Sequence, residues 1–169
     1  MIVFHGSNLE VKNPMLIPSK RLLDFGAGFY LTSDFEQAKK WAIRTTNNRG
    51  NGFPTVSVYS FDMPQLESLH LLRFHRADKD WLQYIAANRT GTIQADAYDV
   101  VFGPVANDQA IRTVNNYLKG YFSEEIAIQL LLPQKLKDQY AFRTEKALSI
   151  LHFMEARYEA FRSRNDRLL

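Results

Sequence analysis

Short apolar runs alternate along the chain with amphipathic segments, a pattern typical of a mixed α+β fold. The apolar and β-branched runs predict strands at residues 2–5, 28–32, 56–61, 69–74, 98–105 and 139–143. Apolar positions at helical spacing predict helices beginning at residue 33 and over 78–88, 108–119, 123–131 and 144–151. We therefore expect one α+β domain over residues 1–160 and a basic tail at 161–169.

Local signals refine the ends of these elements. Ser33 is followed three residues later by Glu36, a capping box that predicts a helix start at Ser33. Turn-forming residues crowd the segment 47–54, which predicts a flexible loop after this helix. The run at 139–143 is expected to close the sheet, and Thr144 is expected to begin the last helix.

Composition excludes several kinds of chemistry. The 169 residues contain no cysteine, so disulfides, thiol nucleophiles and cysteine-bound zinc or iron–sulfur clusters are ruled out. The four histidines lie far apart in the sequence without an HxH or HExxH pair, so no metal site is expected. The net charge of +3 suits an approach to anions without indicating a nucleic-acid coat.

The sequence also bears on location. No apolar run approaches the roughly 18 residues that cross a bilayer, and the first residues lack a signal-peptide core. We expect a cytoplasmic protein with no membrane partner, and a leaderless secreted effector is the alternative.

Three segments carry candidate chemistry. The first is His5-Gly6-Ser7 at the end of the first strand, where a ring nitrogen, an open backbone and a hydroxyl meet. On its own, this segment is better explained as a turn glycine beside a structural histidine than as a binding site. The third is Lys-Asp-Gln-Tyr-Ala-Phe at 137–142, where a polar pair enters a late strand, and by itself it indicates a solvated strand end.

The second segment is Asp-Phe-Gly-Ala-Gly-Phe-Tyr-Leu-Thr at 24–32. Gly26 and Gly28 allow a sharp turn and a close approach by a ligand. The segment is neither a dinucleotide-binding glycine motif, because the third glycine is absent, nor a phosphate loop, because no Gly-Lys-Ser/Thr follows. Alone it indicates a bulge or a tight turn, with Tyr30 as a core aromatic.

Taken in order, these segments resemble the ADP-ribosyltransferase superfamily, in its histidine–tyrosine–glutamate branch with the poly(ADP-ribose) polymerases and the diphtheria-type toxins. The segments at 5–7 and 26–31 match its first two motifs, and 138–140 corresponds in position to its third. With Gly-Pro-Val-Ala-Asn-Asp at 103–108, they are also similar to a bacterial family of uncharacterised, transferase-like proteins. The resemblance covers residues 2 to about 153 and implies a split β-sandwich with flanking helices.

The resemblance also implies a role for each matched residue. His5 would bind a ribose hydroxyl of NAD, Gly6 would offer its backbone to the nicotinamide carboxamide, and Ser7 would bind that carboxamide or the nearby ribose. Tyr30 would stack on the nicotinamide ring, with Trp41 as a second aromatic face. Gly28 belongs to the same cofactor-binding set, and Arg21 could meet the diphosphate, although a solvated loop arginine is the plainer interpretation.

The sequence departs from the family at the catalytic glutamate, where Gln139 stands. A glutamine binds a ribose hydroxyl but supplies neither negative charge nor a base. Asp138 is a poor substitute, because strand alternation directs it to the opposite face. Glu145 has the right parity, but the predicted helix from Thr144 leaves its direction open.

The resemblance thus implies an NAD-dependent mono-ADP-ribosyltransferase, a toxin or effector, with His5, Tyr30, Gln139 and Glu145 as its catalytic candidates. Its expected partners are NAD, a macromolecular acceptor (protein or nucleic acid) and an antitoxin protein. The alternatives are a non-catalytic module that binds NAD or ADP-ribose, and an NAD glycohydrolase. A nucleic-acid-binding protein is a third hypothesis, and it rests on the basic charge alone.

Overall fold

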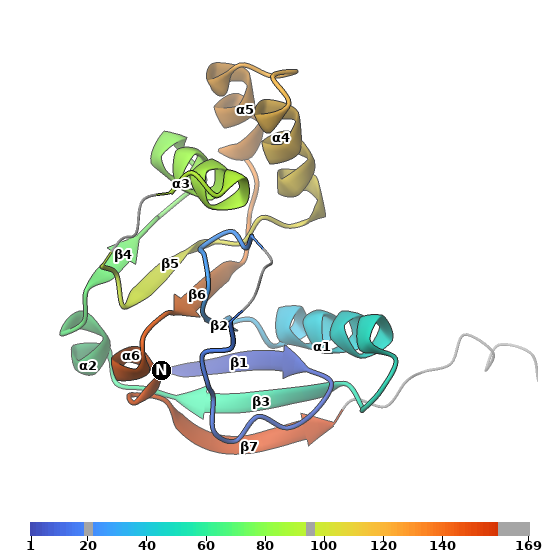
Figure 1. Cartoon of the computed structure of the whole chain (residues 1–169), viewed down its shortest axis with the longest axis vertical. Helices are drawn as coiled ribbons and strands as arrows, with labels where there is room; N and C mark the ends of the chain where they lie inside the picture. Colours follow the sequence, from blue (N-terminus) through green and yellow to red (C-terminus); the bar gives the residue numbers. More distant parts are fainter. Residues whose placement is uncertain (19–21, 94–96, 159–169) are drawn as a thin grey trace, which may run out of the picture.

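The computed structural model of the chain describes residues 1–18, 22–93 and 97–158 (Figure 1). Arg21 and the basic tail at 161–169 lie outside the described residues. The description gives two β-sheets and six helices, so the predicted α+β class is confirmed.

The first sheet, sheet A, is antiparallel and has the strand order β1-β3-β7. Its strands are β1 (Ile2–Ser7), β3 (Thr55–Ser60) and β7 (His152–Tyr158). Helix α1 (Phe35–Arg49) packs on β1 and β3 through a stripe of small buried residues, Ala38, Ala42 and Thr46. Small side chains let a helix approach a sheet closely. This close packing determines where the other residues of α1 lie.

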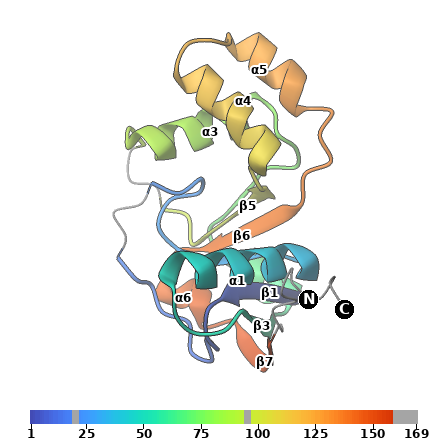
Figure 2. The ribbon, with the colours of Figure 1, turned by 90° about the vertical axis from the view of Figure 1, so that its right-hand side faces the viewer.

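The second sheet, sheet B, has the strand order β2-β6-β5-β4 and is antiparallel except for the parallel β4–β5 pair. Its strands are β2 (Phe29–Leu31), β6 (Asp138–Phe142), β5 (Val100–Pro104) and β4 (Leu71–Arg73). The helices α3 (Lys79–Thr90), α4 (Asp108–Leu118) and α5 (Glu124–Leu131) gather beyond this sheet, at the top of Figures 1 and 2. Two short helices, α2 (Met63–Glu67) and α6 (Glu145–Leu148), complete the described chain.

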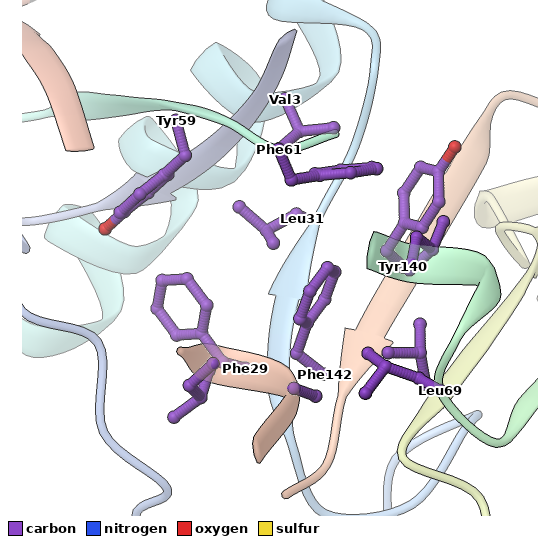
Figure 3. Packing of buried hydrophobic residues seen from close by; sticks show 12 residues of the cluster. Val3, Phe29, Leu31, Tyr59, Phe61, Leu69, Tyr140 and Phe142 are labelled. Carbon is purple, nitrogen blue, oxygen red and sulfur yellow. The ribbon is translucent and has the colours of Figure 1, made fainter. Parts of the chain in front are cut away.

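Two apolar clusters hold these layers together. The first joins residues of both sheets, and Figure 3 shows Val3 and Tyr59 of sheet A facing Leu31 and Phe142 of sheet B. The second cluster lies under α3, α4 and α5 and is centred on the fully buried Trp81, whose indole N–H donates to the Pro104 carbonyl at 2.9 Å. The burial of these apolar side chains is the main stabilising contribution to the fold.

The two sheets meet at one isolated bridge between β1 and the end of β2. The N–H of Phe4 donates to the Thr32 carbonyl at 2.8 Å, and the N–H of Thr32 donates to the Phe4 carbonyl at 3.0 Å. Past Phe4, β1 pairs only with β3 among the described strands. The rest of β1 therefore has an open edge on the side of β2.

The predicted cap of the first long helix is wrong by one residue, and the predicted loop at 47–54 begins three residues too early. The Asp34 carboxylate, rather than the Ser33 hydroxyl, caps α1, accepting from the Gln37 N–H at 2.8 Å. Ser33 donates through its N–H and its hydroxyl to the Asp138 carboxylate. The helix continues to Arg49 and ends where Gly50 adopts φ 67°, so residues 47–49 of the predicted loop are helical.

The end of the domain also differs from the prediction. The run at 139–143 does not close a sheet, because β6 lies between β2 and β5. The last helix stops at Leu148, three residues before the predicted end, and the chain then forms the edge strand β7, which was not predicted. The short helix α2 was not predicted either.

The described residues contain neither a membrane-spanning helix nor a cluster of metal-ligating side chains. None of their helices is long and apolar enough to cross a membrane. In the same residues, no three side chains of His, Asp or Glu gather as a metal site would require.

Candidate functional site

A cavity of about 620 Å³ opens where the edge of β1 is left free. It lies among α1, the segment before β2, the end of α3, the segment after β5 and the strand β6. Its size is within the usual range for small-molecule sites, about 300–1,000 Å³. The lining residues are His5, Gly6, Leu22, Leu23, Asp24, Tyr30, Trp41, Arg44, Thr45, Asn48, Arg49, Arg89, Val105, Ala106 and Gln139. The structure thus brings five of the predicted site residues together: His5, Gly6, Tyr30, Trp41 and Gln139.

Gly6 directs its backbone groups to this cavity. In an antiparallel strand, alternate residues direct their N–H and C=O to the same side. Phe4 uses both groups on Thr32, away from β3, so Gly6, two residues later, directs its own groups to that side. No backbone partner for them lies there among the described residues. A donor and an acceptor are thus free at the cavity wall.

The glycine itself is required by the packing of α1. A Cβ at position 6 would lie 1.9 Å from the Ala38 carbonyl oxygen and 2.7 Å from the Ala42 nitrogen. The absence of a side chain at Gly6 therefore has a structural cause independent of any ligand.

His5 is held as a neutral ring. Its Nδ1 lies 2.8 Å from the Tyr30 carbonyl oxygen, which can only accept, so Nδ1 carries the proton. The ring stacks on Phe29 with 4.3 Å between centroids. Burial, which is the largest cause, and the charge of Arg49 together lower the pKa of His5 to about 4, against the opposite effect of the hydrogen bond to the Tyr30 carbonyl. The remaining nitrogen, Nε2, is therefore an acceptor suited to a hydroxyl group.

Tyr30 contributes its ring to the cavity, while its hydroxyl group serves the fold. The hydroxyl donates to the Gly26 carbonyl at 2.7 Å and accepts from the Phe25 N–H at 3.1 Å. Gly26 adopts φ 79°, so this turn needs a glycine, and the tyrosine hydroxyl ties it down. Burial raises the pKa of Tyr30 well above its usual value, so the phenol stays protonated.

Helix α1 supplies one wall through residues that share a face. Trp41, Arg44, Thr45 and Asn48 recur at the three- and four-residue spacing of a single helical stripe. This stripe is adjacent to the one that packs on sheet A. Sequence reasoning found Trp41 but missed the other three. For Arg44 and Thr45 the available signal was their spacing from Trp41 on a predicted helix, whereas Asn48 fell in the loop predicted at 47–54.

Gln139 lines the cavity from β6, opposite Gly103 of β5. Its side chain is buried, with the residue only 3% exposed, and its Nε2 has no hydrogen-bond partner among the described residues. A buried amide without a partner is costly, so it indicates a place where a ligand acceptor belongs. Asp138 faces away, as predicted, and accepts from Thr32 and Ser33 at the start of α1.

Among the described residues of the lining, the charged side chains are three arginines and one carboxylate. Arg89 lies 2.6 Å from Asp24 in an ion pair that is largely shielded from solvent. Burial raises the pKa of Asp24 more than the arginine lowers it. Arg44 and Arg49 lie on α1 without a carboxylate of the cavity beside them. Sequence reasoning gave none of these four residues a role in the site, although Asp24 belongs to the candidate segment 24–32; they come from three separate parts of the chain.

Other predicted site residues lie elsewhere. Ser7 is buried and is 3.4 Å from the Asn8 side chain, outside the lining of the cavity. Gly28 packs against β6, where an added Cβ would lie 2.9 Å from the Phe142 carbonyl oxygen. Glu145 begins α6 and lines a different cavity with Lys12, Leu148 and neighbouring residues. Arg21 falls outside the described residues.

The comparisons with known proteins bear on the whole chain. No curated protein and no solved structure matches it. A family described as "Protein of unknown function (DUF3990)" matches residues 1–153, which span every described helix, all of sheet B, and sheet A as far as the start of β7. The chain belongs to this family, DUF3990.

Proposed function

We propose that the protein is an NAD-dependent mono-ADP-ribosyltransferase with an ADP-ribosyltransferase-like split β-sandwich, and that it acts as a bacterial toxin or effector on a macromolecular acceptor. The observation that carries this proposal is the open backbone of Gly6 at the wall of the cavity. A carboxamide has one acceptor and one donor group, which a single strand residue can pair with through its N–H and C=O. The nicotinamide end of NAD is such a carboxamide.

The neighbouring residues support the same ligand. The Tyr30 ring and the Trp41 indole provide aromatic faces for a cationic pyridinium, which stacking and cation–π attraction both favour. The neutral His5 offers Nε2 to a ribose hydroxyl, and the unpartnered amide of Gln139 offers its N–H groups to another ribose oxygen. The aromatic rings would thus contact the nicotinamide ring, and the His5 and Gln139 side chains would contact the ribose.

The proposed reaction needs little acid or base catalysis. The bond between C1′ of the ribose and the nicotinamide nitrogen breaks, and its electron pair leaves with nicotinamide, which departs neutral. A lone pair of the acceptor forms the new bond at C1′, and the acceptor loses its proton to solvent. The protein holds the reacting groups in place, while Gln139 orients a hydroxyl without adding negative charge.

Two measurements test the proposal. Calorimetric titration with NAD and with nicotinamide should show binding by the wild type that His5→Ala and Tyr30→Ala abolish or weaken by about tenfold or more. Incubation with NAD labelled in its adenosine part should transfer label to a macromolecule in a cell lysate. His75→Ala, which replaces an exposed histidine outside the cavity, is the control and should behave as wild type. A wild type that binds neither NAD nor nicotinamide contradicts the proposal.

Gln139 favours a second candidate, a non-catalytic module that binds NAD or ADP-ribose. Among the described lining residues, Asp24 is the one carboxylate, and Arg89 holds it. This module predicts binding of NAD without release of nicotinamide. An NAD glycohydrolase, in which water is the acceptor, predicts release of nicotinamide without transfer of label. Chromatography of the same incubation separates the three outcomes.

A further inference from the structure

The three arginines of the cavity differ in how their charge is compensated. Arg89 faces Asp24 at 2.6 Å, and the two side chains are 26% and 12% exposed. Arg44 lies 3.5 Å from Asp108, with both side chains largely in solvent. Arg49 donates through Nη1 to the amide oxygen of Asn8 at 2.7 Å, a partner without charge. Among the described residues, no carboxylate therefore compensates the charge of Arg49, and the bond to Asn8 orients its side chain.

Asn8 is built to hold that position. It is 4% exposed, and its Nδ2 donates to the carbonyl oxygen and the side-chain oxygen of Asn51, at 3.2 and 2.8 Å. Its own carbonyl accepts from the Phe53 N–H at 2.9 Å. With the amide nitrogen engaged on Asn51, the amide oxygen accepts from Arg49 at 2.7 Å and, over the longer distance of 3.4 Å, from the Ser7 hydroxyl. The end of β1 thereby orients a guanidinium on the last turn of α1.

Two further features of the cavity bear on the kind of ligand that this guanidinium would bind. His5 and Arg49 line the same cavity, and the charge of Arg49 contributes to the lowered pKa of His5. The buried, unpartnered amide of Gln139 lies in the same cavity. The cavity therefore combines donors for neutral oxygens with one oriented, uncompensated cation. This combination suits a ligand that has hydroxyl groups and an anionic part.

We propose that Arg49, oriented by Asn8, binds the diphosphate of the dinucleotide, and that Arg89 serves only to hold Asp24. This assignment rests on the proposed function, because it names the part of the NAD molecule that one residue contacts. A guanidinium has five N–H donors, so the bond to Asn8 leaves donors free for two phosphate oxygens. In this assignment Asn8 is a positioning residue, since it acts on the diphosphate through Arg49.

The test uses two probes that carry different parts of NAD. ADP-ribose contains the diphosphate without nicotinamide, and nicotinamide lacks the diphosphate. We expect Arg49→Gln to weaken ADP-ribose binding by about tenfold or more, and to leave nicotinamide binding within about twofold. The control is Lys40→Gln, the same loss of charge at an exposed position of α1 outside the cavity lining, which should change neither affinity. Arg49 is exposed, so its variant is expected to fold.

A double-mutant cycle tests the role of Asn8. Asn8→Ala should weaken ADP-ribose binding in the wild type and have no further effect in the Arg49→Gln background. Equal losses in both backgrounds would show that Asn8 acts on the structure and not through Arg49. If the wild type binds ADP-ribose and Arg49→Gln binds it equally well, the assignment of Arg49 is wrong and the proposed function stands. If the wild type binds neither probe, both proposals are lost.

Discussion

Gly6 of β1 packs directly against the backbone of Ala38 in α1, with no room for a side chain between them. A Cβ at position 6 would lie 1.9 Å from the Ala38 carbonyl oxygen, a distance that only a shift of the helix can relieve. Helix α1 also carries Trp41, Arg44 and Arg49, which line the cavity. This one contact therefore determines the position of the helix that forms one wall of the cavity.

We expect Gly6→Ala to lower the free energy of unfolding by about 3 kcal/mol, since overpacking against backbone cannot be relieved by rotating a side chain. Urea denaturation measures the change. Gly50→Ala is the control, because the space around Gly50 is open and only its positive φ is unfavourable, a cost of about 1 kcal/mol. Equal losses at the two positions would contradict this explanation of Gly6.

Tyr30→Phe separates the role of the hydroxyl from that of the ring. The change leaves the Gly26 carbonyl and the Phe25 N–H without their partner, so stability should fall by about 1–2 kcal/mol. The ring remains at the cavity wall, so NAD affinity should stay within about threefold. Thermal unfolding and calorimetry give the two values. Tyr121→Phe, at a residue that is 74% exposed, should change neither of them.

His5 makes stability depend on pH. Its pKa is about 4 in the folded protein and 6.5 when unperturbed, so between these values the unfolded chain binds more protons. The free energy of unfolding should therefore fall as the pH drops from 6.5 to 4, by at most about 3 kcal/mol for this group. Denaturant titrations at several pH values measure the slope. His5→Gln should flatten it and His75→Gln, at an exposed position, should not; an unchanged slope in His5→Gln would count against the buried neutral ring.

Sequence reasoning found the elements whose signals are local. The buried run at 98–105 and the capped helices near 108 and 123 were predicted because their caps and apolar positions lie within a few residues. Ser33 was misassigned because its partner, Asp138, lies 105 residues away in the sequence. The strand β7 was missed because an edge strand buries little, and most of its side chains are exposed.

The candidate site, like the fold, was predicted only in part from the sequence. The predicted residues His5, Gly6, Tyr30, Trp41 and Gln139 line one cavity, and the resemblance of their motifs was the signal that grouped them. Arg49 and Arg89 were missed because nothing in the sequence separates an arginine held in a cavity from one in solvent. What distinguishes Arg49 is a neutral partner, Asn8, that only the folded chain brings to it.

At Gln139, we expect a single substitution to change stability and ligand binding in opposite directions. Its buried Nε2 has no partner among the described residues, so Gln139→Met should raise the free energy of unfolding by about 1 kcal/mol by removing an unsatisfied donor. The same change removes the N–H groups available to a ribose oxygen, so NAD binding should weaken by about tenfold or more. Urea denaturation and calorimetry on one preparation measure both quantities, and Gln129→Met, at an exposed position of α5, should leave both unchanged. A loss of stability in Gln139→Met would mean that the amide is satisfied within the fold, and Gln139 would then have no claim as a ligand-binding residue.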